Sequence, residues 1–144
     1  MTSHPKSRPT LVDETVGTST IEFALVGMVL FWVVFGIVET GRMLWTFNAL
    51  KSTALDTARC VAIGSSRCSN GQTYAVSVAA GRGIGSLTAS EVTITTTAGT
   101  SCTSSSNLGL NFTEVSITHV YRTMVPLFPA PSTLATTACF PNNS

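Results

Sequence analysis

The sequence predicts an α+β protein in which one long N-terminal helix packs on a small antiparallel sheet. Three observations support this prediction: an uncharged apolar segment near the N-terminus, an amphipathic helical pattern directly after it, and an alternation of period two toward the C-terminus. The chain has 144 residues, only 10% of them charged, and a net charge of +1. Its Lys and Arg residues are scattered singly rather than gathered in a basic stripe, so we expect no nucleic-acid partner.

The N-terminal part of the chain divides into a polar leader and an apolar helix. Residues 1–17 are polar and lack a helical period, so we expect a flexible leader. Residues 18–45 are expected to form a transmembrane helix. The uncharged stretch from Phe23 to Val38 spans only about 24 Å as a helix, whereas a bilayer core is about 30 Å thick. We therefore expect the span to extend to Trp45, a residue suited to the membrane interface.

Besides Glu22 near its start, two charged residues stand inside this extended span. Glu39 and Arg42 are three residues apart, so we expect an ion pair across one helical turn. The helix is expected to continue without a break, because residues 46–62 contain neither Gly nor Pro. Gly64 then provides a C-terminal stop. A helix from Thr18 to Ile63 would be about 69 Å long, which implies a membrane half and a half that packs on a soluble domain.

Residues 46–144 are expected to form that soluble α+β domain. Its helical part carries an apolar stripe at steps of three and four residues, made by Phe47, Leu50, Ala54, Ala58 and Val61. A short second helix is predicted over residues 72–81, and three strands are predicted around 92–95, 114–121 and 134–140. Short links favour an antiparallel sheet, and the stripe can cover its apolar face.

Four cysteines, Cys60, Cys68, Cys102 and Cys139, all follow the apolar segment. No CxxC occurs and no histidine lies near a cysteine pair, so we expect no metal site. An even number of cysteines in a region rich in Ser and Thr favours disulfides in an oxidising compartment, with unpaired buried thiols as the alternative. Of three connectivities we prefer Cys60–Cys68 with Cys102–Cys139, which would stabilise by about 2.6 and about 3.9 kcal/mol.

The soluble part offers few groups for catalysis. His119 is its one candidate base, and Glu91 and Glu114 are its carboxylates beyond Asp56. His119 follows the period of Ile117 and its apolar neighbours, so we interpret it as a histidine on the sheet face. The run GRGIG lacks the Lys-Ser/Thr of a phosphate-binding loop and is interpreted as a turn. We therefore expect no enzymatic activity, no cofactor and no small-molecule substrate.

An acidic residue, Glu22, stands where the apolar segment begins. Ser19 and Glu22 fit a capping box, S-x-x-E, and the carboxylate would also favour the positive end of the helix dipole. A catalytic or transport acid inside the membrane would usually have a partner, and the apolar run holds no second carboxylate, His or Lys near Glu22. That hypothesis is therefore disfavoured.

The stretch GTSTIEF, residues 17–23, resembles the processing site of prepilins of the tight-adherence, or Flp, branch of the type IV pilin superfamily. Gly17, Glu22 and Phe23 take the positions of that motif. The resemblance implies that a prepilin peptidase cuts after Gly17, so that Thr18 becomes the new N-terminus. It also implies that Glu22 meets the N-terminal amine of a neighbouring subunit, since a charge in a low dielectric is costly unless it is paired.

A second block, FGIVETGRMLW, resembles the TadE-like pilus assembly proteins, in which Gly-Ile-x-Glu-x-Gly-Arg ends the apolar segment. These positions are taken here by Gly36, Ile37, Glu39, Gly41 and Arg42. The tail, with Cys139 and Phe140 close to its end, is also similar to many such proteins.

The resemblance implies a minor pilin or pseudopilin in the bacterial inner membrane, with a cytoplasmic N-terminus and a periplasmic TadE-like domain. Its partners would be a prepilin peptidase, other pilin or pseudopilin subunits, the tight-adherence secretion machinery and the lipid bilayer. The alternative is an uncleaved, membrane-anchored periplasmic interaction domain unrelated to pili. Cleavage after Gly17 distinguishes the two.

Overall fold

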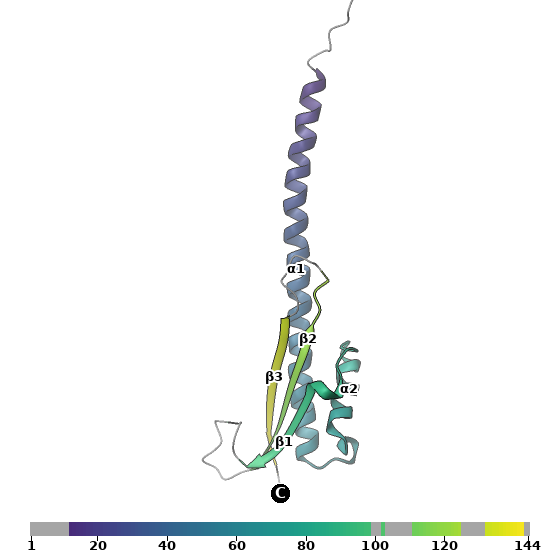
Figure 1. The fold of residues 1–144 in the computed structure, drawn as a ribbon, viewed down its shortest axis with the longest axis vertical. Coiled ribbons are helices and arrows are strands. Elements are labelled where there is room, and N and C mark those ends of the chain that lie inside the picture. Colours follow the sequence, from purple (N-terminus) through teal and green to yellow (C-terminus); the bar gives the residue numbers. More distant parts are fainter. Residues whose placement is uncertain (1–11, 99–101, 103–110, 125–131, 143–144) are drawn as a thin grey trace, which may run out of the picture. The chain divides into compact units, whose positions relative to one another are not determined.

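The fold is α+β, as the sequence predicts, in a computed structural model that describes residues 12–98, 102, 111–124 and 132–142. A long helix α1 (Val12–Ala62) is followed by a short helix α2 (Gly71–Gly81) and a three-stranded antiparallel sheet (Figure 1). The chain divides into two compact units, with the boundary between Val38 and Glu39. We describe each unit by itself.

Helix α1 begins at Val12, earlier than the start expected at Thr18. Residues 12–17, expected to lack regular structure, are therefore helical, whereas residues 1–11 lie outside the described part of the chain. Extending an existing helix is much easier than nucleating one, so an apolar helix readily propagates into a polar flank. Ser19 lies inside the helix, and the capping box predicted for Ser19 and Glu22 is wrong for the uncut chain.

The described side chains of the first unit form one exposed apolar helix surface. Apolar residues from Ile21 to Val38 are exposed almost without exception. Phe31 and Phe35 stack one turn apart, with ring centroids separated by 6.3 Å. Among the described residues this is the one helix long and apolar enough to cross a membrane, and none of its most apolar window is buried. An exposed apolar surface of this extent indicates a lipid or protein partner.

Helix α1 ends at Ala62, close to Gly64, the residue that the sequence predicts as its C-terminal stop. Gly64 has a φ of 63°, the left-handed conformation that glycine adopts at little cost. The Ser65 N–H donates to the Cys60 carbonyl at 3.3 Å, and the Gly64 N–H donates to the Val61 carbonyl at 3.0 Å. These two bonds form a Schellman motif, which satisfies carbonyl groups at the end of the helix.

The sheet lies entirely in the second unit and has the order β1-β2-β3. Strand β1 (Val92–Ala98) and strand β3 (Ser132–Pro141) flank the central strand β2 (Asn111–Tyr121), and both pairings are antiparallel. Side chains of β2 alternate between a buried and a more exposed face, as a strand with one covered face requires. The three predicted strands and their antiparallel pairing are confirmed.

The apolar stripe of α1 covers the inner face of this sheet. Leu50, Ala54 and Ala58 are fully buried in one core with Val115 and Ile117 of β2. Figure 1 shows this half of α1 alongside the strands, and α2 contacts strand β1. The predicted packing of the amphipathic half of the helix on the sheet is therefore confirmed.

Two details of the stripe differ from the prediction. Phe47 was expected in the core but is 36% exposed. Thr53 and Thr57 are instead completely buried. The Thr53 hydroxyl donates to the Ala49 carbonyl at 2.8 Å, which shows how a short hydroxyl side chain is satisfied within its own helix.

Helix α2 closes the remaining side of the core. Ala75 and Ala79 are completely buried, and the Asn70 side chain caps the helix by accepting from the Thr73 N–H at 3.2 Å. Arg82 directly follows the helix and connects it to α1, where it donates to the Thr53 hydroxyl at 2.9 Å and forms an ion pair with Asp56.

Two disulfides join parts of the second unit. Cys60 is paired with Cys68 and Cys102 with Cys139, with Cα–Cα distances of 6.1 Å in both. The first links the end of α1 to a 3-10 turn (Ser66–Cys68), and the second links the residue Cys102 to strand β3. This is the connectivity preferred from the sequence.

Candidate functional site

Glu39, in the first turn of the second unit, is a buried carboxylate with several partners. Its side chain is only 6% exposed. The Tyr121 hydroxyl donates to its Oε1 atom at 2.8 Å, and the Met124 N–H makes a longer contact of 3.4 Å with the same atom. Arg42 Nη1 lies 3.4 Å from Oε2, as the spacing of the two residues predicts. A buried charge is tolerated only with such partners.

The environment of Tyr121 keeps its hydroxyl protonated. Burial raises the pKa of Tyr121 above 10.0, and the hydrogen bond to Glu39 raises it further, while the positive charge of Arg42 opposes this change. The phenol is therefore a stable donor to Glu39 at any physiological pH. The sequence carries no signal for this role of Tyr121, because the role depends on a contact between segments far apart in the chain.

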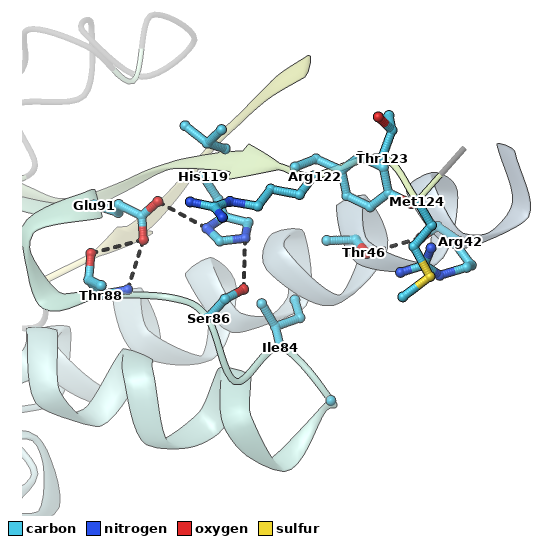
Figure 2. A pocket seen from close by; sticks show the side chains of 13 residues that line it. Arg42, Thr46, Ile84, Ser86, Thr88, Glu91, His119, Arg122, Thr123 and Met124 are labelled. Atoms are coloured by element: carbon cyan, nitrogen blue, oxygen red, sulfur yellow. Dashed lines mark hydrogen bonds and ion pairs between the residues drawn. The ribbon is translucent and has the colours of Figure 1, made fainter. Parts of the chain in front are cut away.

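An open groove of about 680 Å³ lies beside this cluster, within the second unit. Figure 2 shows it between the first turns of this part of α1, the segment after α2, and the end of β2. Its lining includes Arg42, Thr46, Ile84, Ser86, His119 and Met124. The groove combines two arginines, several hydroxyls and an apolar floor.

His119 connects the groove to the segment after α2. It is buried on the inner face of the sheet, which confirms its interpretation as a sheet-face histidine. Its Nε2 atom lies 3.2 Å from the Ser86 hydroxyl, and its Nδ1 atom lies 3.0 Å from Glu91 Oε1 (Figure 2). Of the carboxylates considered from the sequence, the structure brings Glu91 to His119.

Glu91 is fixed through its second oxygen as well. The Thr88 N–H and the Thr88 hydroxyl donate to Glu91 Oε2 at 2.8 and 2.9 Å, as part of a capping box on the short 3-10 turn Ala89–Glu91. Burial alone would raise the pKa of Glu91, but the bonds from Thr88 and His119 outweigh it and lower the pKa below 4.5. The carboxylate is therefore ionised at neutral pH. Ser86 and Thr88 carry no motif that sequence analysis could have found.

The residues predicted from the prepilin resemblance lie on α1. Gly17 and Thr18 are within the helix, and Glu22 and Phe23 follow on exposed positions. Gly41 is exposed too, with open space where a side chain would stand. Cleavage after Gly17 and pairing of Glu22 with a second chain stay predictions.

Fold and site together indicate a class of protein: one anchored in a membrane by a single N-terminal helix that continues into a small, disulfide-bonded α+β domain. Residues 17–59 match the model of the TadE-like protein family, so this segment of the chain is TadE-like, as its motifs predict. That family implies a part in the assembly of tight-adherence pili. No curated protein and no solved structure gave a significant match to the chain.

Proposed function

We propose that this protein is a minor pilin or pseudopilin that takes part in assembling a bacterial tight-adherence pilus. The observation that carries the proposal is the TadE-like match over residues 17–59, which covers the prepilin-like stretch and the Glu39–Arg42 block. The exposed apolar helix surface supports it, since such a surface suits first a bilayer and then neighbouring helices in a filament. It would act by protein contacts.

In this proposal the membrane-spanning segment is Ser19–Val38, shorter than the span of residues 18–45 expected from the sequence. Ser19–Val38 measures about 30 Å as a helix, the thickness of a bilayer core. Glu39 is the first residue whose side chain is enclosed by the sheet-bearing unit, through its bond to Tyr121. Trp45, which is 71% exposed, would stand near the membrane interface.

The two disulfides support one orientation in this proposal. Bonds of this kind persist in oxidising compartments, so the second unit would lie in the periplasm and the leader in the cytoplasm. The chain would then be a single-pass inner-membrane protein that meets the secretion machinery and other pilin subunits. Incorporation into the filament would require only that the helix leave the bilayer for a protein environment.

Processing would occur after Gly17. A protease needs an extended substrate, and Gly17 and Thr18 are weak helix formers, so the helix can open locally at this point. The new amine of Thr18 would then be a positive charge available to Glu22 of a neighbouring subunit. A pairing of this kind lowers the cost of a carboxylate in a low dielectric.

Co-expression with a prepilin peptidase tests the proposal. The intact mass of the purified wild-type chain should fall by the mass of residues 1–17, and Gly17→Ala should abolish the change. Gly27→Ala is the matched control, because Gly27 lies on the same helix with open space around it, and its cleavage should be unchanged. A wild-type chain that stays uncut would favour the uncleaved anchor and overturn the proposal.

A further inference from the structure

The Ser86, His119 and Glu91 side chains lie in the order of a nucleophile, a base and an orienting acid. Ser86 Oγ is 3.2 Å from His119 Nε2, and Glu91 Oε1 is 3.0 Å from His119 Nδ1. Both distances are within the reach that nucleophilic catalysis requires. His119 is 6% exposed, whereas Ser86 is exposed and lines the groove.

The contacts of Glu91 determine the tautomer of His119. Both oxygens of the carboxylate are held, one by His119 and the other by Thr88. An ionised carboxylate accepts hydrogen bonds and cannot donate them. The Nδ1 atom of His119 therefore carries the hydrogen of the bond to Glu91. In the neutral form of the imidazole the lone pair then lies on Nε2, where it can accept the Ser86 hydroxyl hydrogen.

We infer that Ser86 is an activated nucleophile and that this groove hydrolyses carboxylic esters. The groove gives an ester two kinds of surface. Ile84, Val120 and Met124 provide apolar contact for an acyl group. Arg122 also lines the groove, where a cation would stabilise a developing oxyanion.

The reaction would proceed in two balanced steps. Ser86 Oγ attacks the carbonyl carbon while its proton passes to His119 Nε2, and the alcohol leaves with that proton as the C–O bond breaks. A water molecule then attacks the acyl-Ser86 ester, giving its proton to Nε2. The free acid forms as the Ser86 oxygen takes the proton back. Water and the ester are the sole reactants, and the activity would be additional to the proposed role in pilus assembly.

The same contacts would also exist if they served only to hold the segment after α2 against the sheet. The test therefore needs a measurement that a purely structural role leaves unchanged. A fluorophosphonate probe fits this purpose, because it phosphonylates serines activated by a neighbouring base. Purified full-length protein in detergent micelles should be labelled, with the adduct located at Ser86 by peptide mass spectrometry.

Variants connect that labelling to the named residues. Ser86→Ala should abolish the adduct, and His119→Gln should lower its rate by about 100-fold or more, the contribution of a general base. Ser77→Ala is the matched control: Ser77 is exposed on α2, its hydroxyl donates to the Tyr74 carbonyl at 2.7 Å, and labelling of Ser86 should be unchanged. The rate of p-nitrophenyl acetate hydrolysis should likewise be lost in Ser86→Ala, lowered in His119→Gln and unchanged in Ser77→Ala.

Folding of each variant is checked by circular dichroism. If His119→Gln fails to fold, the inference is decided by the wild-type protein alone, from the labelling rate of Ser86 relative to that of the other serines. Labelling of wild-type Ser86 no faster than that of other serines would overturn the inference, as would equal labelling in a folded His119→Gln variant. Neither outcome bears on cleavage at Gly17, so the proposed function is tested separately.

Discussion

The Tyr121 hydroxyl, at the end of strand β2, donates a 2.8 Å hydrogen bond to the buried carboxylate of Glu39, 82 residues earlier in the chain. This bond joins the end of the central strand to the first helical turn after Val38. Arg42 pairs with the other oxygen of the same carboxylate. In this protein, the Glu of the Gly-Ile-x-Glu-x-Gly-Arg block thus fixes the sheet to the helix.

Replacing Tyr121 by Phe should destabilise the second unit by about 1–3 kcal/mol, the cost of leaving a buried charged acceptor without its donor. Urea unfolding of the detergent-solubilised protein measures this loss. Tyr74→Phe is the matched control, since Tyr74 is the one other tyrosine of the chain and is half-buried on α2. Equal losses in the two variants would show that Tyr121 contributes only packing.

A double-mutant cycle can assign that energy to the contact itself. We expect Tyr121→Phe and Glu39→Gln to be coupled by about 0.5–3 kcal/mol, because the two side chains share one hydrogen bond. The pair Tyr74→Phe and Glu39→Gln should instead be additive. A coupling near zero between Tyr121 and Glu39 would contradict the proposed fixation of the sheet to the helix.

Contacts within one turn of helix could be predicted from the sequence, whereas contacts between distant segments could not. The Glu39–Arg42 pair follows from helical spacing alone, and it is present. Tyr121 could be placed on the inner face of a strand, but its partner depends on where the strand ends relative to the helix. The same applies to Ser86, which meets His119 only because the segment after α2 folds back onto β2.

The errors in the apolar stripe also have a physical origin. Periodicity shows which helix face is buried but not where along the helix the covering sheet stops. It therefore predicts Phe47 in the core, although this residue is 36% exposed. Thr53 looked polar, yet its hydroxyl is satisfied by the Ala49 carbonyl and its methyl group packs as an apolar group. Burial of Thr53 therefore costs little, whereas the buried Thr57 hydroxyl has no hydrogen-bond partner among the described residues.

Gly71→Ala should be destabilising, because this glycine allows a close approach of three elements. A Cβ atom at residue 71 would lie 2.5 Å from Ile94 Cδ1 and 2.9 Å from Val61 Cγ2. Overpacking of this kind costs about 1–3 kcal/mol. Gly81→Ala is the control, since Gly81 ends the same helix with nothing within 4 Å of an added Cβ. A Gly71→Ala protein as stable as Gly81→Ala would contradict this close packing.

The two disulfides should contribute unequally. Cys60–Cys68 spans a sequence separation of 8 and Cys102–Cys139 a separation of 37, and a longer loop restricts the unfolded chain more. Replacing both cysteines of a pair by Ser should cost about 3 kcal/mol for the first and about 4 kcal/mol for the second. Urea unfolding of each double variant checks the order. A larger loss for the Cys60–Cys68 pair would show that loop length does not dominate.

Acid should weaken the attachment of the segment after α2 to the sheet, through Glu91. The folded-state pKa of Glu91 lies below its ordinary value of 4.5, because the hydrogen bonds from Thr88 and His119 outweigh its burial. A carboxylate whose pKa is lowered by folding contributes stability that is complete above the unfolded value. That stability is lost as the pH falls through the folded value.

We therefore expect the free energy of unfolding of the second unit to decrease as the pH is lowered from 6 to 3, with Glu91→Gln less stable at pH 6 and less dependent on pH. Glu114→Gln is the matched control, because Glu114 lies on the opposite face of β2 from His119, and this variant should keep the wild-type slope. Urea titrations at fixed pH values give the slopes. If Glu91→Gln and wild-type protein have the same slope, the His119–Glu91 contact does not hold this segment in solution, and the orientation of His119 would need another cause.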